Sequence, residues 1–221
     1  MGNCCSEEQK KDGGIISLKK NNRHLRNLKE RDDHSPIPDN VIEVDKMNLV
    51  SPKAMEALNN LSGFTHTPKT DHSDLPVLGP FKYENGDTYE GQFKNGLRTG
   101  KGKVICPSGS FYEGYWDVDL KNGFGRQVHV DGSVYQGDWL NGYASGTGEY
   151  HAADGTIYKG HWKDDKQNGI GKEVWADGST YEGEYKDSLK HGNGVFVWSD
   201  NSKYEGQFHE NDIEGEGKHE I

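Results

Sequence analysis

The first six residues, Met-Gly-Asn-Cys-Cys-Ser, contain the groups best suited to covalent modification. Gly2 becomes the N-terminal amine once Met1 is removed, and Ser6 completes the acceptor pattern for N-myristoylation. Cys4 and Cys5 lie where a chain that is already held at a bilayer is S-palmitoylated. Because one myristoyl chain binds membranes only marginally, stable attachment needs a second signal. We therefore predict that Gly2, Cys4 and Cys5 are lipidation sites.

Two other interpretations of this hexapeptide are open. A Met-Gly start followed by Ser6 can arise by chance, and vicinal cysteines can bind a metal ion. No His or Cys at ligand spacing accompanies Cys4 and Cys5, which disfavours a metal site. We therefore expect neither a metal nor a cofactor.

A basic segment follows the hexapeptide and would supply an additional membrane signal. Between residues 10 and 31 only Asp12 and Glu30 are acidic, and the net charge is +6, from eight basic residues minus two acidic ones. The basic residues are Lys10, Lys11, Lys19, Lys20, Arg23, Arg26, Lys29 and Arg31. Each basic residue near an anionic leaflet contributes about 1 kcal/mol of attraction. The segment is predicted to bind anionic lipid, with a solvated tail as the alternative.

Patterns that would indicate catalysis are missing from the sequence. The Gly-x-Gly pairs do not extend to Gly-x-Gly-x-x-Gly or to Gly-Lys-Ser/Thr, and there is no His-Glu-x-x-His and no nucleophile elbow. A repeated column of glutamates, which includes Glu90, Glu113 and Glu182, is more typical of a solvated ladder than of an acid/base pair. We therefore predict that the chain is not an enzyme.

Composition limits the fold and the partners. Of 221 residues only 31% are hydrophobic, 30 are Gly and the formal net charge is -10. The low hydrophobic fraction and the many glycines disfavour a thick core, and the negative net charge disfavours nucleic-acid binding. No apolar run long enough to span a bilayer or to act as a secretory signal is present, so we expect the protein on the cytoplasmic side of a membrane. The plasma membrane or cell cortex is the expected place, with a cilium as the alternative.

The chain divides into two kinds of sequence near residue 78. The first part lacks all five Trp and all eleven Tyr and holds five of the seven Pro, a composition typical of disorder. We assign residues 1–31 to an acylated polybasic membrane anchor and residues 32–78 to a disordered linker. Residues 79–221 form the second part, which is a repeat array.

The repeat has a period of 23 residues and occurs six times. Tyr-x-Gly triplets begin at Tyr89, Tyr112, Tyr135, Tyr158, Tyr181 and Tyr204. A Gly-x-Gly pair follows each triplet at a constant offset, and an aromatic residue lies four positions after each Tyr. A fixed period of this size predicts an array in which each unit packs on its neighbours.

Each repeat is predicted to be a β-hairpin. Asn-Gly or Asp-Gly pairs such as Asp131-Gly132 precede the Tyr residues and are the strongest short hairpin signal. Residues 125–130 should then pair with residues 133–139, and a longer loop over residues 140–145 should join successive units. Alternation places Tyr135, Gly137 and Trp139 on one face. We predict an all-β, elongated, twisted antiparallel array of twelve strands, roughly 58 Å long at about 4.8 Å per strand.

These motifs resemble those of the MORN (membrane occupation and recognition nexus) repeat family, and the resemblance covers residues 79–221. It implies an elongated β array that binds proteins or associates with lipid at membranes, the cell cortex or the cytoskeleton. Gln136 and Lys159 depart from the family's Tyr-Glu-Gly triplet, and Asp119, Asp165, Ser188 and Asn211 stand where Gly96 and Gly142 occupy the loop. These departures put a uniform binding surface in doubt but not the fold.

Two functions remain as hypotheses. The first is a non-catalytic membrane-tethered scaffold or adaptor that binds a protein partner, or a second copy of itself, through the array. The second is a structural component of a cytoskeletal, cortical or ciliary assembly. We expect the partner to contact the aromatic face at Trp116, Trp139 and Trp162, or to add a strand at the C-terminal edge.

Overall fold

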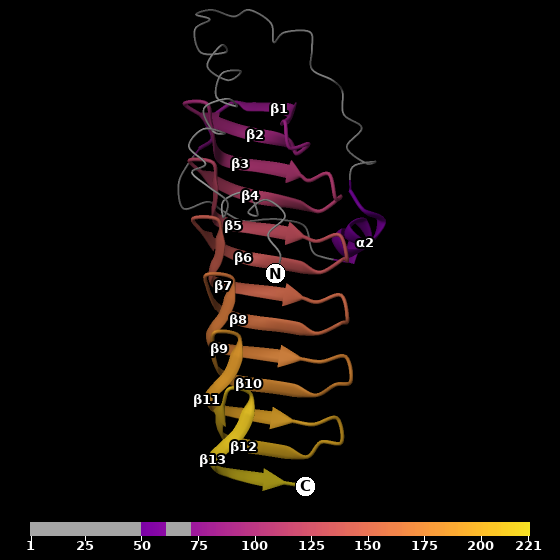
Figure 1. The fold of residues 1–221 in the computed structure, drawn as a ribbon, viewed down its shortest axis with the longest axis vertical. Coiled ribbons are helices and arrows are strands. Elements are labelled where there is room, and N and C mark those ends of the chain that lie inside the picture. The colour runs from indigo at the N-terminus through magenta and orange to yellow at the C-terminus, as the bar shows by residue number, and fades with distance from the viewer. Residues whose placement is uncertain (1–49, 61–71) are drawn as a thin grey trace, which may run out of the picture.

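A computed structural model describes residues 50–60 and 72–221 of the chain. They form one antiparallel sheet of 13 strands arranged in chain order, with a single short helix beside it (Figure 1). The helix is α2 (Pro52–Asn60), and the strands are β1 (Val77–Lys82), β2 (Thr88–Lys94), β3 (Leu97–Ile105), β4 (Phe111–Asp117), β5 (Leu120–Val128), β6 (Val134–Leu140), β7 (Tyr143–His151), β8 (Ile157–Lys163), β9 (Lys166–Val174), β10 (Thr180–Lys186), β11 (Leu189–Val197), β12 (Lys203–His209) and β13 (Asp212–Glu220). The predicted all-β array of hairpin repeats is confirmed. The strand beyond the twelve expected is β13, which follows the last Tyr-x-Gly strand and pairs with β12.

Part of the segment predicted to be a disordered linker is a helix. Ser51 caps α2, since its Oγ accepts a hydrogen bond from the Ala54 N–H at 3.2 Å, and Pro52 occupies the first helical position. Ala54 is fully buried against the sheet. The prediction of disorder is therefore wrong for residues 50–60, because this helix gains its apolar contacts from the array.

Two kinds of turn alternate along the array. At Val130-Asp131-Gly132 a three-residue turn joins β5 to β6: the His129 N–H donates to the Ser133 carbonyl at 2.9 Å, and Gly132 has a φ of +91°. This is the hairpin expected from Asp-Gly, but only Gly132 takes a positive φ, as in a type I turn followed by a glycine bulge.

The second kind of turn is shorter than predicted. Asn141 and Gly142 alone join β6 to β7, with φ values of +50° and +92°, in place of the predicted loop over residues 140–145. Two consecutive positive φ values are typical of type I′ turns, whose twist matches that of the paired strands. The other five pairs are Asn95-Gly96, Val118-Asp119, Asp164-Asp165, Asp187-Ser188 and Glu210-Asn211.

The residues that replace the loop glycine connect neighbouring repeats. The Asp119 N–H donates to the Arg98 carbonyl at 3.0 Å, and the Asp119 Oδ1 accepts from the Arg98 N–H at 2.8 Å. Asp165 and Asn211 bind Ala144 and Lys190 in the same way, and Ser188 binds Gln167. Each side chain that replaces Gly thus adds at least one hydrogen bond between neighbouring repeats.

The core is a single ladder of aromatic rings on one face of the sheet. Successive rings meet edge to face, with centroids 5.0–5.7 Å apart and ring planes inclined by 81–90°. The order of the rings is Phe81, Phe93, Tyr89, Trp116, Tyr112, Trp139, Tyr135, Trp162, Tyr158, Tyr185, Tyr181, Phe208 and Tyr204. Each pair contributes about 0.5–1.5 kcal/mol beyond its burial. The ladder therefore holds the repeats together without a second layer.

Glycine pairs make room for the tyrosine rings. Gly114 on β4 lies opposite Gly125 on β5, and a Cβ atom on Gly125 would lie 2.5 Å from Cζ of Tyr112. The Tyr112 ring thus covers the bare backbone, and its hydroxyl donates to the Tyr115 carbonyl at 2.9 Å. The predicted placement of aromatics and Gly on one face is confirmed.

Candidate protein-binding surface

The predicted membrane-binding residues lie outside the described part of the chain. These are the lipidation sites Gly2, Cys4 and Cys5 and the basic residues Lys10, Lys11, Lys19, Lys20, Arg23, Arg26, Lys29 and Arg31. They stay predictions. Within residues 50–60 and 72–221 there is no helix with the length and apolar character needed to cross a bilayer.

The three tryptophans expected to contact a partner are core residues. Trp116, Trp139 and Trp162 are only 3%, 5% and 5% exposed. Each indole N–H donates, at 3.2 Å, to the carbonyl of Gly102, Gly125 or Gly148 of the preceding repeat. Both their apolar surface and their polar atom are used inside the array, so a contact surface has to be sought elsewhere.

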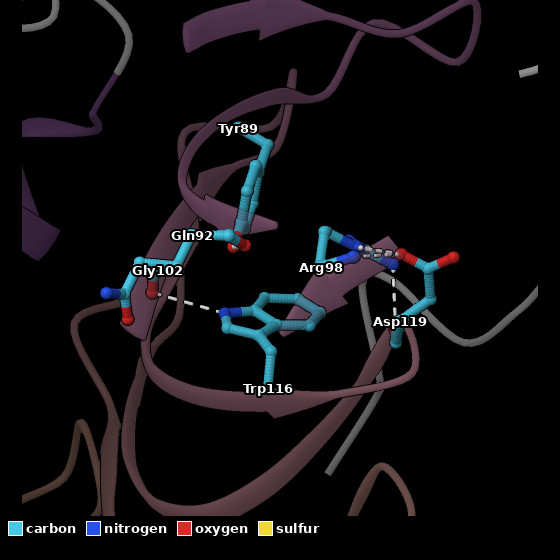
Figure 2. A network of polar contacts seen from close by, with 6 residues as sticks. All are labelled: Tyr89, Gln92, Arg98, Gly102, Trp116 and Asp119. Atoms are coloured by element: carbon cyan, nitrogen blue, oxygen red, sulfur yellow. Dashed lines mark hydrogen bonds and ion pairs between the residues drawn. The ribbon is translucent and has the colours of Figure 1, made fainter. Parts of the chain in front are cut away.

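Figure 2 shows how closely the first tryptophan is enclosed. The Arg98 guanidinium lies 4.1 Å from the centroid of Trp116, and its Nε donates to Asp119 Oδ1 at 3.1 Å. On the other side of the ring the Trp116 indole points to the Gly102 carbonyl. A cation above an indole face adds about 1 kcal/mol or more when it is partly desolvated. This cluster is therefore a stabilising element of the first repeats.

A second group of aromatic residues remains partly exposed on the same face. Tyr150 lies on β7 and Phe196 on β11, and Trp175 and Trp198 lie in the turns after β9 and β11. All four pack against the ring ladder with part of their surface in solvent. Trp175 stacks on Phe196 at 5.4 Å, and Phe196 contacts Trp198 at 4.8 Å. We call these four residues the aromatic strip.

The strip is specific to the later repeats. The positions equivalent to Phe196 and Trp198 in the first repeat are Val104 and Cys106, which are 0% and 4% exposed. Cys106 is thus a small packing residue of the core. The face changes from closed and aliphatic near β3 to open and aromatic near β11.

The indole groups of the strip differ from those of the core in their hydrogen bonding. Trp175 Nε1 and Trp198 Nε1 have no hydrogen-bond acceptor among residues 50–60 and 72–221, whereas each core indole has one. A large apolar ring with an unused donor at its edge is the kind of side chain that dominates protein interfaces. The strip therefore has the chemistry of a protein-contact surface.

An ion pair without net charge, formed by Lys190 and Glu173, lies beneath the strip. Lys190 Nζ is 4.8 Å from the centroid of Trp175 and 3.6 Å from Glu173 Oε2, and both side chains are mostly buried. Glu173 also accepts a hydrogen bond from the Tyr185 hydroxyl at 2.9 Å. Burial, and then the negative charge of Glu173, raises the pKa of Tyr185 well above its usual range, so the hydroxyl stays protonated. The strip thus carries no net charge of its own.

Nothing in this arrangement resembles a catalytic or metal centre. Across the described residues there is no cluster of three His, Cys, Asp or Glu side chains that could hold a metal ion. The predicted glutamate column is an ion-pair ladder, in which Glu113 pairs with Arg126 and Lys172 pairs with Glu182 at 3.1 Å.

Sequence reasoning missed Trp175 and Trp198 although a signal was present. These two residues share a column with Cys106, His129 and Ala152. A change from small or polar residues to Trp in one column marks a position that the framework of the repeat does not require. Such a column is a better guide to a contact surface than the tryptophans that recur in every repeat.

Comparison with known proteins identifies the repeats. The MORN repeat model matches residues 89–111, 112–134, 135–157, 158–180, 181–203 and 204–220. A comparison with curated protein sequences finds no match.

Solved structures show only a distant likeness. The TCP domain of SAS-4 (dCPAP) from Drosophila melanogaster, in complex with a proline-rich motif of Ana2 (dSTIL), is 16% identical with a TM-score of 0.37, over 57% of this chain and 69% of that one. The TCP10 domain of Danio rerio CPAP, in complex with a peptide of STIL, is 14% identical with a TM-score of 0.37, over 63% and 59%. A streptogramin B lyase is 16% identical with a TM-score of 0.18, over 66% and 55%.

Proposed function

The chain belongs to the MORN repeat family, and from this premise we propose that it is a membrane-tethered scaffold that binds protein partners through its array. MORN repeats indicate a protein-binding repeat scaffold, and no enzyme family is indicated. The tether would be the acylated N-terminus, and the location would be the cytoplasmic side of a membrane.

The observation that carries the protein-binding role is the aromatic strip. A single-layered sheet needs its aromatic rings for its own core, and the first repeats bury theirs. The later repeats add Trp175 and Trp198 beyond that core, partly exposed and with unused indole donors. A partner that offers apolar side chains and backbone carbonyls would desolvate both rings and accept both hydrogen bonds.

Charge supports a division of labour between the array and the tail. Residues 81–221 carry 15 basic and 24 acidic residues, a net charge of -9, whereas residues 10–31 carry +6. Anionic lipid repels the first and attracts the second. The tail is therefore the membrane-binding part in this proposal, and the array is free to bind protein.

The tether is tested by expressing the full chain in a eukaryotic host. Mass spectrometry should find myristate on Gly2 and palmitate on Cys4 or Cys5. Gly2→Ala should move the protein from the membrane fraction to the supernatant, and a Cys4→Ser/Cys5→Ser variant should keep myristate but bind membranes less stably. A Gly2→Ala protein that still sediments with the cytoskeletal fraction would favour the alternative of a structural component.

The protein-binding role is tested by proximity labelling from the full chain. The Trp175→Ala/Trp198→Ala variant should lose a defined set of labelled neighbours. Tyr143→Ala is the matched control, since Tyr143 is an aromatic residue on β7 that is 42% exposed and does not belong to the strip. Circular dichroism should show that both variants fold. An unchanged set of neighbours in the folded double variant would refute the assignment of the strip.

A further inference from the structure

The face opposite the ring ladder carries a continuous row of cross-strand neighbours. Consecutive residues of a strand point to opposite faces, so Phe111 lies behind the face that Tyr112 occupies. Phe111 is paired directly with Ile105 on β3 and with Val128 on β5, and Val128 is paired with Val134 on β6. These four residues, one from each of four adjacent strands, form the first segment of the row.

Helix α2 and Val50, which precedes it, cover the first segment. Ile105, Phe111, Val128 and Val134 are 6%, 0%, 0% and 2% exposed and enclose Ala54, with Ala57 packed against the same cluster. Two hydrogen bonds hold the start of the helix at the turns beside the row: the Ser51 N–H donates to the Gly109 carbonyl at 3.1 Å, and the Ser51 Oγ donates to the Val130 carbonyl at 3.2 Å. Ile105, Phe111, Val128 and Val134 thus form a surface that binds one helix, which we call a helix seat.

The same row continues beyond α2 with a second segment of equal length. His151 on β7 separates the two segments, and then Ile157, Val174, Thr180 and Val197 are paired in succession on β8, β9, β10 and β11. All four are half-buried, and no element within residues 50–60 and 72–221 lies over them. Three strand spacings of about 4.8 Å give a length of about 14 Å, which matches a helix of about nine residues at 1.5 Å per residue.

The two margins of the second segment differ in charge. On the side of the three-residue turns, Asp154, Asp177 and Asp200 are exposed, and each is fixed by accepting the N–H of the residue two positions later at 2.9 Å. On the other side Lys159 and Lys172 are paired with Glu149 and Glu182, so that margin is neutral. At the first seat the helix lies against the equivalent turn, because the Cβ and backbone of Lys53 lie close to Gly132, next to Asp131.

We propose that Ile157, Val174, Thr180 and Val197 form a second helix seat, and that its occupant is a short basic amphipathic helix of a partner protein. The helix would place small apolar residues against the row, as α2 places Ala54 and Ala57, and Lys or Arg residues toward Asp154, Asp177 and Asp200. Continuity with the α2 interface and the acidic margin both support this occupant. The inference rests on the proposed protein-binding function and names one kind of partner for it.

The probe for the test is a fluorescein-labelled synthetic peptide with the sequence of residues 49–62 and the substitution Glu56→Lys, which makes the α2 sequence basic. Fluorescence anisotropy with the full chain should show saturable binding of one peptide per chain. The peptide with the unmodified sequence should bind more weakly, and raised salt should weaken the binding of the basic peptide. Absence of saturable binding to the full chain would overturn the proposal.

Matched variants locate the site. Val174→Lys should weaken binding at least tenfold, while Ile170→Lys should leave it unchanged, because Ile170 is a 55% exposed residue on the same strand that does not belong to the row. Ala54→Glu should release α2 and raise the stoichiometry to two peptides per chain. Equal binding by the Val174→Lys and Ile170→Lys variants, each folded by circular dichroism, would refute the second seat.

The outcome can be separated from that of the proposed function. The Trp175→Ala/Trp198→Ala variant should bind the peptide as the unmodified chain does, because the strip lies on the opposite face. If that variant loses its labelled neighbours while the peptide binds to no chain, the helix seat alone is wrong. If the peptide binds at Val174 while the strip variant keeps all its neighbours, the assignment of the strip alone is wrong.

Discussion

Raising the pH above 10 is expected to unfold the array, because the ring ladder needs its tyrosine hydroxyls to be neutral. Tyr89, Tyr112, Tyr135, Tyr158 and Tyr181 are at most 1% exposed, and Tyr185 is 4% exposed. Burial raises the pKa of all six, to about 12 for Tyr181 and higher for the others. In the unfolded chain each hydroxyl would ionise near pH 10.

The sign and size of the effect follow from this difference. A group whose pKa is raised in the folded state contributes its full stability below the unfolded pKa and loses it as the pH rises toward the folded pKa. Between pH 9 and pH 11 one such tyrosine reduces the free energy of unfolding by about 1.4 kcal/mol. Six of them together remove about 8 kcal/mol, which is comparable to the whole stability of an ordinary domain.

The assay follows tyrosinate absorbance and far-ultraviolet circular dichroism in one alkaline titration. The exposed fraction of the eleven tyrosines should ionise first, without loss of sheet. The six tyrosines of the ladder whose pKa is raised should ionise together with the loss of sheet, and a return to pH 8 should restore both signals. Ionisation of all eleven near pH 10 with the sheet intact would refute the reasoning.

Two substitutions test the packing of the array. Gly125→Ala should lower the free energy of unfolding by about 3 kcal/mol, because the new Cβ would meet the Tyr112 ring at 2.5 Å. Gly178→Ala is the control and should lower it by about 1 kcal/mol, because Gly178 has a φ of +88° but no atom within 4 Å of the new Cβ. Equal urea midpoints for the two variants would contradict this. Arg98→Ala should lower the free energy of unfolding by about 2 kcal/mol through the lost contacts with Trp116 and Asp119. Lys166→Ala is the control, because Lys166 and Asp187 form an exposed ion pair, and it should lower the free energy by under about 0.5 kcal/mol. A Lys166→Ala chain as unstable as the Arg98→Ala chain would disprove the role given to Arg98.

The strand order and the ring columns could be predicted because the same motif recurs in every repeat. Tyr-x-Gly and the aromatic residue four positions later fix the face and the register, and the structure confirms both. The turn between repeats could not be predicted in the same way. Val118 and Asp119 both take positive φ values of +47° and +66°, which L residues adopt reluctantly. The hydrogen bonds from Asp119 to Arg98 support that conformation, and these partners are 21 positions apart in the sequence.

The helix and the aromatic strip were missed for a different reason. Composition can show whether a segment is able to bury enough surface by itself. Residues 50–60 cannot do so without the array. Ala54 becomes buried only because it packs against Phe111 and Val128 of the array. The exposure of Trp175 similarly depends on what neighbouring repeats place beside it. Both features come from differences between repeats, whereas the predictions relied on what the repeats share.

The strand order of the sheet also determines how the array bears mechanical load. Every strand pairs only with its neighbours in the chain, so the hydrogen bonds between strands run along the long axis (Figure 1). Tension applied between the two ends would open these bonds one after another at the terminal strand, in the manner of a zipper. It would not shear many of them at once. Stretching would therefore peel single hairpins away at low force, and the relaxed hairpins would re-pair on the strand left behind. An array of this kind suits the spacing of partners along a surface better than the transmission of pulling force.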